Sequence, residues 1–175
     1  MKKLSCLIML CLSFFVTGLA SAEQRIALVI ANGAYQTSAG GALANPKNDG
    51  RIMAAALRDI GFDVTVVEDS SQKDMRRAIL SHRAKLKAAG QGAVSFFYYA
   101  GHGATNSMDG AGGANYMIPV DARLQTKDDL YVEGVSLTDV VTSFADATMN
   151  FIVFDACRNF PFGSATSRSS YRGFV

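Results

Sequence analysis

The sequence predicts an α/β fold of three layers, in which a mostly parallel sheet carries helices on both faces. Short apolar runs rich in branched and aromatic residues are typical of buried strands, and several occur along the chain. They alternate with stretches whose apolar residues recur at helical spacing. Because strands that alternate with helices favour parallel pairing through right-handed crossovers, this order predicts helices on both sides of the sheet. The length of 175 residues fits one domain.

The first 22 residues have the layout of a secretory signal peptide. Lys2 and Lys3 form a short basic start, residues 4–19 are almost wholly apolar, and Ala20-Ser21-Ala22 is a small-residue cleavage signal. An uncleaved single-pass anchor is the alternative interpretation. We expect an exported protein, periplasmic or secreted, without stable membrane association after cleavage.

Cleavage after residue 22 would change both the charge and the cysteine content. Removal of two lysines takes the formal net charge from +2 to 0 (2 − 2), so no basic excess indicates a nucleic-acid partner. Cys6 and Cys11 would leave with the signal, and Cys157 alone cannot form an internal disulfide. A lone thiol is either a small buried apolar group or a nucleophile. Its place between Asp155 and Arg158 favours the nucleophile, since a thiolate needs a positive or hydrogen-bonding environment.

The predicted elements of the first half begin with a buried strand at residues 25–31, which ends in an Asn-Gly turn. The loop 36–44 is too poor in large apolar residues to form core. Asn45-Pro46 predicts the start of a helix, and Gly61 its end. Its expected inward stripe is Ile52, Met53, Ala56, Leu57 and Ile60.

A second strand at residues 62–67 leads to a second helix, which is predicted to be capped by Ser71 and to end at Gly90. Its apolar stripe contains one histidine, His82, which we interpret as a core-edge residue and not as a catalytic base. The stripe consists of Met75, Ile79, His82 and Leu86.

The second half begins with a strand at residues 93–99, followed by a glycine-rich loop at 101–113 and a short extended piece at 116–120. An acidic segment, 121–133, then leads to a helix that begins near Ser136. The strand 151–154 comes after it. The helix is expected to turn inward Leu137, Val140, Val141 and Phe144.

Two of these buried strands each lead into a residue suited to catalysis. The strand at 93–99 runs into His102, and the strand at 151–154 runs into Cys157. If the strands are parallel neighbours, both side chains lie at the same sheet edge. A cysteine nucleophile needs a nearby base and donors for the developing oxyanion, for which the N–H groups of Gly103 and Cys157 are candidates. A turn histidine and an unrelated buried cysteine are the alternative.

The motifs YYAGHG at 98–103 and DACRN at 155–159 resemble caspase-like cysteine peptidases, nearer to bacterial metacaspase-like proteins than to animal caspases. The resemblance extends over about residues 25–162. It implies a caspase-like (haemoglobinase-type) fold with a large-subunit catalytic domain at 23–162, after the signal peptide and before a polar tail at 163–175. It also implies that His102 and Cys157 form a dyad that cleaves polypeptides through an acyl-enzyme.

The resemblance further implies a preference for basic substrates. Asp155 stands where animal caspases, which cut after aspartate, have glutamine; in metacaspase-like relatives an acid there binds the Arg or Lys before the scissile bond. A partly buried carboxylate pairs well with a cation, which agrees with this role. Asp49 matches a second acid of that pocket, although a residue favoured by the helix dipole is an equal interpretation. Ala100 replaces a hydroxyl residue that some metacaspases have, so that part of the pocket is not reproduced.

Other acidic and basic residues have weaker interpretations. Some metacaspases bind an activating calcium ion in the acidic region, but a solvated loop is favoured here because no ligand spacing is recognisable. Arg168 and Arg172 are either self-cleavage sites or part of a plain tail. The acidic residues are Asp121, Asp128, Asp129 and Glu133.

Together these features predict a cysteine endopeptidase that cleaves after Arg or Lys and needs no cofactor. The resemblance also predicts that the small-subunit portion of the family is missing here, which leaves an open sheet edge beside the Cys157 strand. A small-subunit-like segment or a second copy of the chain could pair there. The alternative function is an inactive module for interaction or assembly. A Rossmann-type nucleotide site is disfavoured, since the first turn lacks the glycine fingerprint.

Overall fold

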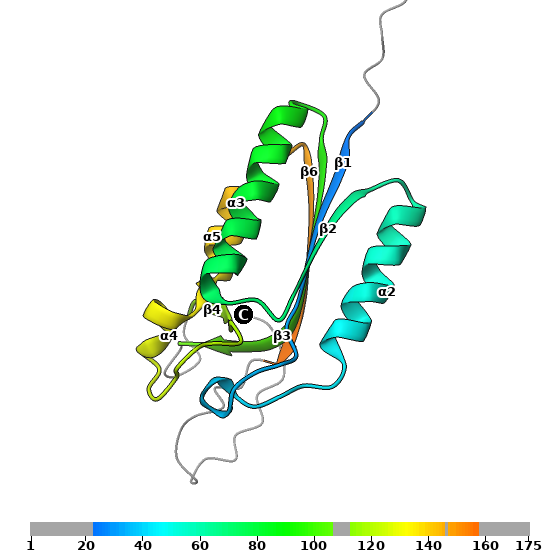
Figure 1. Ribbon diagram of the computed structural model, residues 1–175. Coiled ribbons are helices and arrows are strands. Elements are labelled where there is room, and N and C mark those ends of the chain that lie inside the picture. The colour runs from blue at the N-terminus through cyan, green and yellow to red at the C-terminus, as the bar shows by residue number, and fades with distance from the viewer. Residues whose placement is uncertain (1–22, 107–112, 146, 158–175) are drawn as a thin grey trace, which may run out of the picture.

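The computed structural model describes residues 23–106, 113–145 and 147–157, which form an open mixed sheet between two layers of helices (Figure 1). In this part of the chain the sheet has six strands. Four of them are parallel in the order β2-β1-β3-β6, and β3 also continues antiparallel through β4 to β5. The predicted three-layer α/β architecture is therefore confirmed.

The described elements have the following bounds. The strands are β1 Arg25–Ala31, β2 Asp63–Glu68, β3 Val94–Thr105, β4 Asn115–Met117, β5 Val135–Ser136 and β6 Met149–Cys157. The helices are the 3-10 turn η2 Thr37–Ala39 and the α-helices α2 Pro46–Asp59, α3 Gln72–Ala89, α4 Asp129–Glu133 and α5 Leu137–Ser143.

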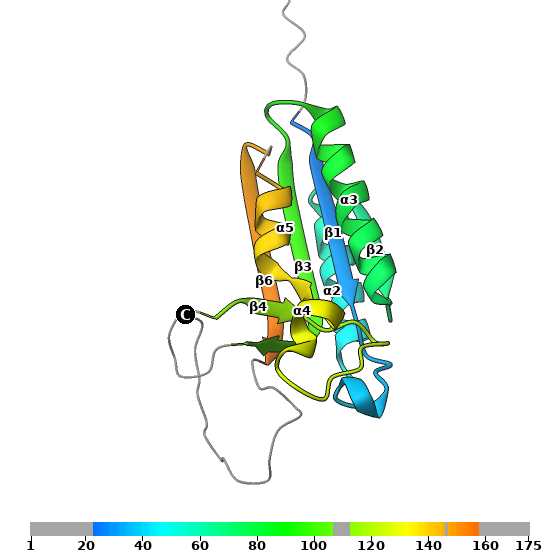
Figure 2. The ribbon, with the colours of Figure 1, turned by 90° about the vertical axis from the view of Figure 1, so that its left-hand side faces the viewer.

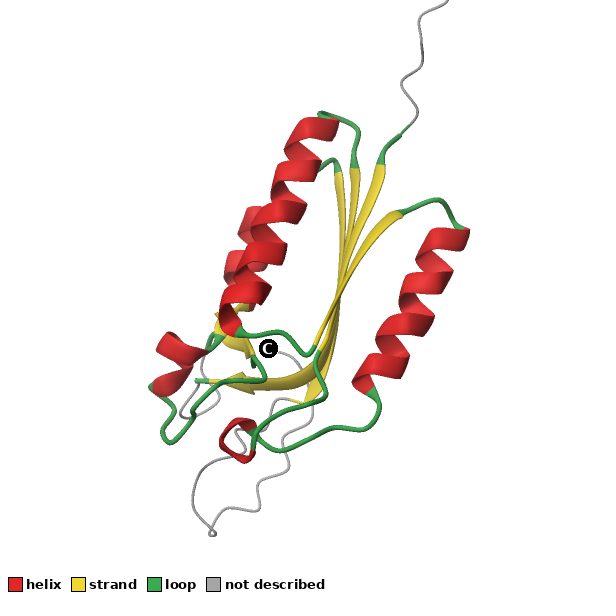
Figure 3. Ribbon diagram, viewed as in Figure 1, coloured by secondary structure: helices red, strands yellow, loops and turns green. Residues whose placement is uncertain are grey.

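The sheet separates two apolar clusters. Helices α3 and α5 cover one face, as Figures 2 and 3 show, and there Leu28, Phe97 and Phe144 are fully buried. Helix α2 covers the other face, where Val29 and Leu57 pack together. Because each strand buries alternate residues on opposite faces, the central strands β1 and β3 read as continuous apolar runs.

The predicted inward stripe of α2 is largely wrong. Ile52 and Ile60 are 62% and 58% exposed. The helix instead approaches the sheet through small residues, because a Cβ added at Gly50 would lie 2.6 Å from the Cβ of Ala31. The backbone of α2 therefore lies close to the sheet, and the large side chains that the periodicity suggested do not fill the space between them. The buried residues of α2 are Pro46, Gly50, Ala54 and Leu57.

Helix α3 follows the prediction closely. The Ser71 hydroxyl accepts the N–H of Asp74 at 3.2 Å, which confirms the N-cap. His82 is buried, with Nε2 3.0 Å from Ser95 Oγ, and burial lowers its pKa to about 4. All predicted stripe residues are buried: Met75, Ile79, His82 and Leu86.

Two further predictions need correction. Val141 of α5 is exposed, although Val140 and Phe144 are buried as expected. Strand β3 does not end before His102 but continues through it to Thr105, because β4 supplies a new antiparallel partner with Gly103 opposite Met117. His102 therefore lies inside a paired strand and not in a glycine-rich turn.

Several predictions fall on residues outside the described part of the chain. They concern the signal peptide with Cys6 and Cys11, the side chain of Cys157, and Arg158, Arg168 and Arg172. Among the described residues, no helix is both long and apolar enough to span a membrane.

Candidate active site

The strands that carry His102 and Cys157 are parallel neighbours, which is the condition that the sequence argument required. β3 pairs with β6 over nine residues, and three successive Cα pairs at their carboxyl ends are Ala100 with Asp155, Gly101 with Ala156, and His102 with Cys157. The backbone positions of the two predicted dyad residues are thus directly opposite each other. Figure 1 shows the ends of both strands meeting beside the loop that follows β1.

The imidazole of His102 is held by that loop. Its Nε2 lies 2.9 Å from the carbonyl oxygen of Gly41. Since a carbonyl oxygen can only accept a hydrogen bond, Nε2 carries a proton, and in the neutral imidazole this leaves the lone pair on Nδ1. The ring also packs against Tyr35, with centroids 4.5 Å apart and planes tilted by 54°.

The loop 36–44 was expected to lie outside the core, and this is corrected by the structure. Ala39 is fully buried, and Gly40 approaches the imidazole so closely that an added Cβ would be 2.9 Å from Nε2 of His102. The sequence did not reveal this contact, because the group that binds the histidine is a backbone carbonyl. The run of small residues was the available signal, since small residues permit close approach.

The peptide groups of His102 are bound by two buried tyrosines. The N–H of His102 donates to Tyr35 Oη at 2.9 Å, and its carbonyl oxygen accepts from Tyr99 Oη at 2.6 Å. The two hydroxyls are 3.1 Å apart. The main chain and the side chain of His102 are therefore fixed by the same small cluster.

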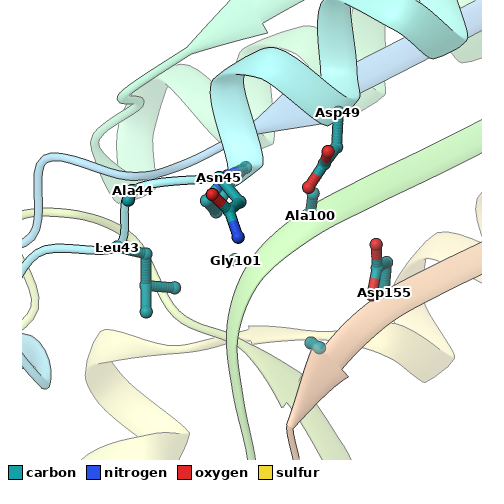
Figure 4. Close-up of a pocket in the computed structure, with 9 residues that line it drawn as sticks. Leu43, Ala44, Asn45, Asp49, Ala100, Gly101 and Asp155 are labelled. Atoms are coloured by element: carbon teal, nitrogen blue, oxygen red, sulfur yellow. The ribbon is translucent and has the colours of Figure 1, made fainter.

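A pocket of about 400 Å³ opens beside this pair of strands. It lies between the start of α2 and the carboxyl ends of β3 and β6 (Figure 4). Asp49 and Asp155 both project into it, from α2 and β6 respectively. The described residues that line it are Leu43, Ala44, Asn45, Pro46, Asp49, Ala100, Gly101, Asp155 and Ala156.

The carboxylate of Asp155 is exposed and accepts a hydrogen bond from the Tyr98 hydroxyl at 3.1 Å. Burial of the phenol, together with its bond to Asp155, raises the pKa of Tyr98 well above its ordinary value. Tyr98 therefore remains a protonated donor, and Asp155 remains free to face the pocket with its other oxygen.

The remaining predicted groups are placed as follows. Gly103 is buried in β3 next to His102, and Cys157 is the last residue of β6. Both predicted oxyanion donors therefore belong to the ends of the same strand pair. Their role in binding an oxyanion stays a prediction.

Carboxylates of the acidic segment 121–133 accept hydrogen bonds from backbone N–H groups of the fold. Asp129 accepts the N–H groups of Gln125 and Thr126, both at 2.7 Å, and these bonds lower its pKa. Asp121 accepts the N–H of Gln72 at 3.1 Å. Across residues 23–106, 113–145 and 147–157, no group of three or more His, Cys, Asp or Glu side chains could hold a metal ion. The segment as described does not fit a calcium site.

Comparison with known proteins gives the family. The caspase domain of the Peptidase C14 family matches residues 24–172, most of the chain. The chain belongs to this caspase-domain family. No curated protein gives a significant match.

The fold also occurs in solved structures. The crystal structure of protein GSU0716 from Geobacter sulfurreducens matches with a TM-score of 0.57 and 20% sequence identity. The match covers 77% of this chain and 50% of the Geobacter chain, so the caspase-domain chain described here spans half the length of that protein. At this identity the likeness concerns the fold alone.

Proposed function

We propose that this chain is a cysteine endopeptidase in which Cys157 is the nucleophile and His102 the general base, and that it cleaves after Arg or Lys. The observation that carries the proposal is the succession of Cα pairs between β3 and β6. The pair His102–Cys157 lies two residues beyond the pair Ala100–Asp155, which borders the acidic pocket.

The chemistry follows from the state of the imidazole. With its Nε2 proton donated to Gly41, His102 takes the thiol proton of Cys157 at Nδ1, and the thiolate attacks the peptide carbonyl. The N–H groups of Gly103 and Cys157 stabilise the tetrahedral oxyanion. The imidazolium then protonates the leaving amine, and water, activated by His102, hydrolyses the acyl-enzyme.

The acidic pocket supports the basic preference. Two carboxylates, Asp49 and Asp155, face one space of about 400 Å³, which is large enough for an extended cationic side chain. A guanidinium can bind carboxylate oxygens bidentately, and an ammonium binds them as a point charge. An aspartate side chain in the same pocket would meet like charge, so acidic substrates are disfavoured.

The test is hydrolysis of matched fluorogenic peptides with Arg, Lys or Asp before the reporter. We expect turnover of the Arg and Lys peptides that is lost in both Cys157→Ala and His102→Ala. If none of the peptides is hydrolysed in a Cys157-dependent way, the proposal that the chain is a cysteine endopeptidase is refuted.

The pocket is tested separately. Asp155→Asn and Asp49→Asn should raise KM for Arg and Lys peptides by about tenfold or more, because loss of a charge-assisted hydrogen bond costs about 1.5–3 kcal/mol. Asp59→Asn, an exposed aspartate at the far end of α2, is the matched control and should leave KM unchanged. Equal changes of KM in all three variants would show that Asp49 and Asp155 do not bind the basic side chain of the substrate.

A second candidate is a non-catalytic interaction module. The observation that favours it is an exposed apolar row on β6, Met149, Phe151 and Val153, on a strand that pairs with β3 alone among the described strands. Iodoacetamide separates the two functions. A nucleophilic Cys157 should react well below pH 8, whereas a structural thiol should stay inert until unfolding.

Export to the periplasm or the exterior is part of the proposal and rests on the sequence pattern of residues 1–22. The mature N-terminus of the secreted chain, determined by mass spectrometry, should begin at residue 23. An intact Met1 on the exported protein would contradict cleavage.

A further inference from the structure

The tyrosines around His102 form a hydrogen-bonded ring whose direction can be deduced. The peptide N–H of His102 can only donate, so Tyr35 Oη accepts it at 2.9 Å. The carbonyl oxygen of His102 can only accept, so Tyr99 donates to it at 2.6 Å. The carbonyl oxygen of Ile118 is a second acceptor, 3.1 Å from Tyr99 Oη. Because both carbonyls can only accept, the single hydrogen of Tyr99 goes to one of them, and Tyr35 donates across the 3.1 Å contact between the hydroxyls.

The hydrogen of Tyr35 therefore has Tyr99 as its acceptor, and the hydrogen of Tyr99 has the carbonyl of His102 as its nearer acceptor, at 2.6 Å against 3.1 Å for the carbonyl of Ile118. The ring runs from His102 N–H to Tyr35, from Tyr35 to Tyr99, and from Tyr99 back to the carbonyl of His102. Burial raises the pKa of Tyr35 to about 12 and that of Tyr99 well above its ordinary value. Both phenols thus keep their hydrogens at any pH at which a peptidase works.

The aromatic ring of Tyr35 also packs against the imidazole of His102, with ring centroids 4.5 Å apart. It comes from the loop after β1, the same segment that supplies the carbonyl of Gly41 to Nε2. The loop after β1 thus accepts a hydrogen bond from the N–H of His102, packs against its imidazole and accepts the hydrogen bond of its Nε2.

We propose that Tyr35 is a positioning residue for His102: its hydroxyl, acting through Tyr99, holds the histidine in the place where Nε2 donates to Gly41 and Nδ1 stays basic. This inference rests on the proposed role of His102 as the general base. Tyr35 would touch neither substrate nor the reacting atoms. Its effect is on the tautomer and the position of the imidazole.

The first measurement is independent of turnover. The chain has two histidines, His82 and His102, so nitrogen-15 spectra of an untagged chain contain two imidazole spin systems. In the wild type we expect His102 to show a protonated Nε2 and a bare Nδ1. In Tyr35→Phe, which keeps the ring but removes the acceptor of the buried N–H, we expect averaged nitrogen shifts that indicate mixed tautomers.

The second measurement is kinetic. Tyr35→Phe should lower kcat on the Arg peptide by about tenfold to a hundredfold with KM within about twofold, because a misplacement of about 1 Å costs about 10² in rate. Tyr99→Phe, which breaks the same ring, should reproduce both effects. Tyr116→Phe removes a hydroxyl from a buried tyrosine of β4 and is the matched control; it should change neither.

The outcomes separate cleanly. A Tyr35→Phe chain that is folded by circular dichroism and keeps the wild-type tautomer and kcat would overturn the inference, as would equal losses in Tyr116→Phe. If the wild type hydrolyses no peptide, the proposed function fails, while the imidazole spectra of Tyr35→Phe and Tyr99→Phe still decide whether Tyr35 positions His102.

Discussion

The contact between Gly40 and His102 gives a prediction with an internal control. Gly40 has φ +106°, and a Cβ there would lie 2.9 Å from both Cδ2 and Nε2 of the imidazole. Gly92 has nearly the same φ, +102°, but a Cβ there would meet no heavy atom within 4 Å. Gly40→Ala and Gly92→Ala therefore share the backbone strain and differ in the clash.

The magnitudes follow from these distances. Both substitutions should lower the free energy of unfolding by about 1–2 kcal/mol, the cost of a left-handed conformation for a residue with a Cβ. Ordinary Cβ contacts begin at 3.4 Å, so in Gly40→Ala the imidazole must retreat by about 0.5 Å (3.4 − 2.9). If a shift of about 1 Å costs about 10² in rate, half that shift costs about tenfold in kcat.

The assay combines urea unfolding with turnover of the Arg peptide for both variants. We expect similar losses of unfolding free energy but a tenfold lower kcat in Gly40→Ala alone. The imidazole of His102 should also lose its fixed Nε2 proton in that variant. If Gly40→Ala keeps the kcat of Gly92→Ala, the imidazole is not held against this loop and the argument is refuted.

Two further predictions concern buried polar groups. The pKa of His82 is about 4 in the folded chain and about 6.5 when unfolded, so the unfolded state binds more protons between these values and the free energy of unfolding should fall by about 3 kcal/mol from pH 6.5 to 4. Denaturant titrations should show a flatter pH dependence over this window in His82→Gln, and an unchanged slope would contradict the assignment. Tyr98→Phe removes the donor to Asp155 and should raise KM for Arg peptides about fivefold, the effect of about 1 kcal/mol, with kcat little changed. An unaltered preference for Arg over an uncharged residue would argue against orientation of Asp155 by Tyr98.

Elements whose burial depends on large side chains were predictable from the sequence. The strand Arg25–Ala31 has the predicted bounds, and the apolar stripe of α3 is buried at every predicted position, His82 included. In both, the residues that fill the core are also the residues that create the periodic pattern. The neighbouring placement of the His102 and Cys157 strands was a condition in the sequence argument, and the pairing of β3 with β6 meets it.

Features that depend on close approach or on backbone groups could not be predicted. The stripe of α2 was wrong because Gly50 and Ala54, and not the larger Ile52, face the sheet. The group that accepts the Nε2 proton of His102 is the backbone carbonyl of Gly41. Every residue has a backbone carbonyl, so no residue type in the sequence marks this one. The extension of β3 to Thr105 depends on antiparallel pairing with β4, which begins ten residues later (115 − 105) and has only three residues, too few to give a clear strand pattern.

In the proposed reaction, the pairing of β3 with β6 sets the distance between the residue that selects the substrate and the nucleophile. Residues 155 and 157 are separated by two residues of extended strand, a rise of about 7 Å that the backbone sets whatever side chains it carries. Substrate preference can therefore change through residue 155 without moving the position of the cysteine. Deletion of one residue from β6 before Asp155 would disrupt both at once, because a one-residue shift of register turns every later side chain of the strand to the opposite face of the sheet.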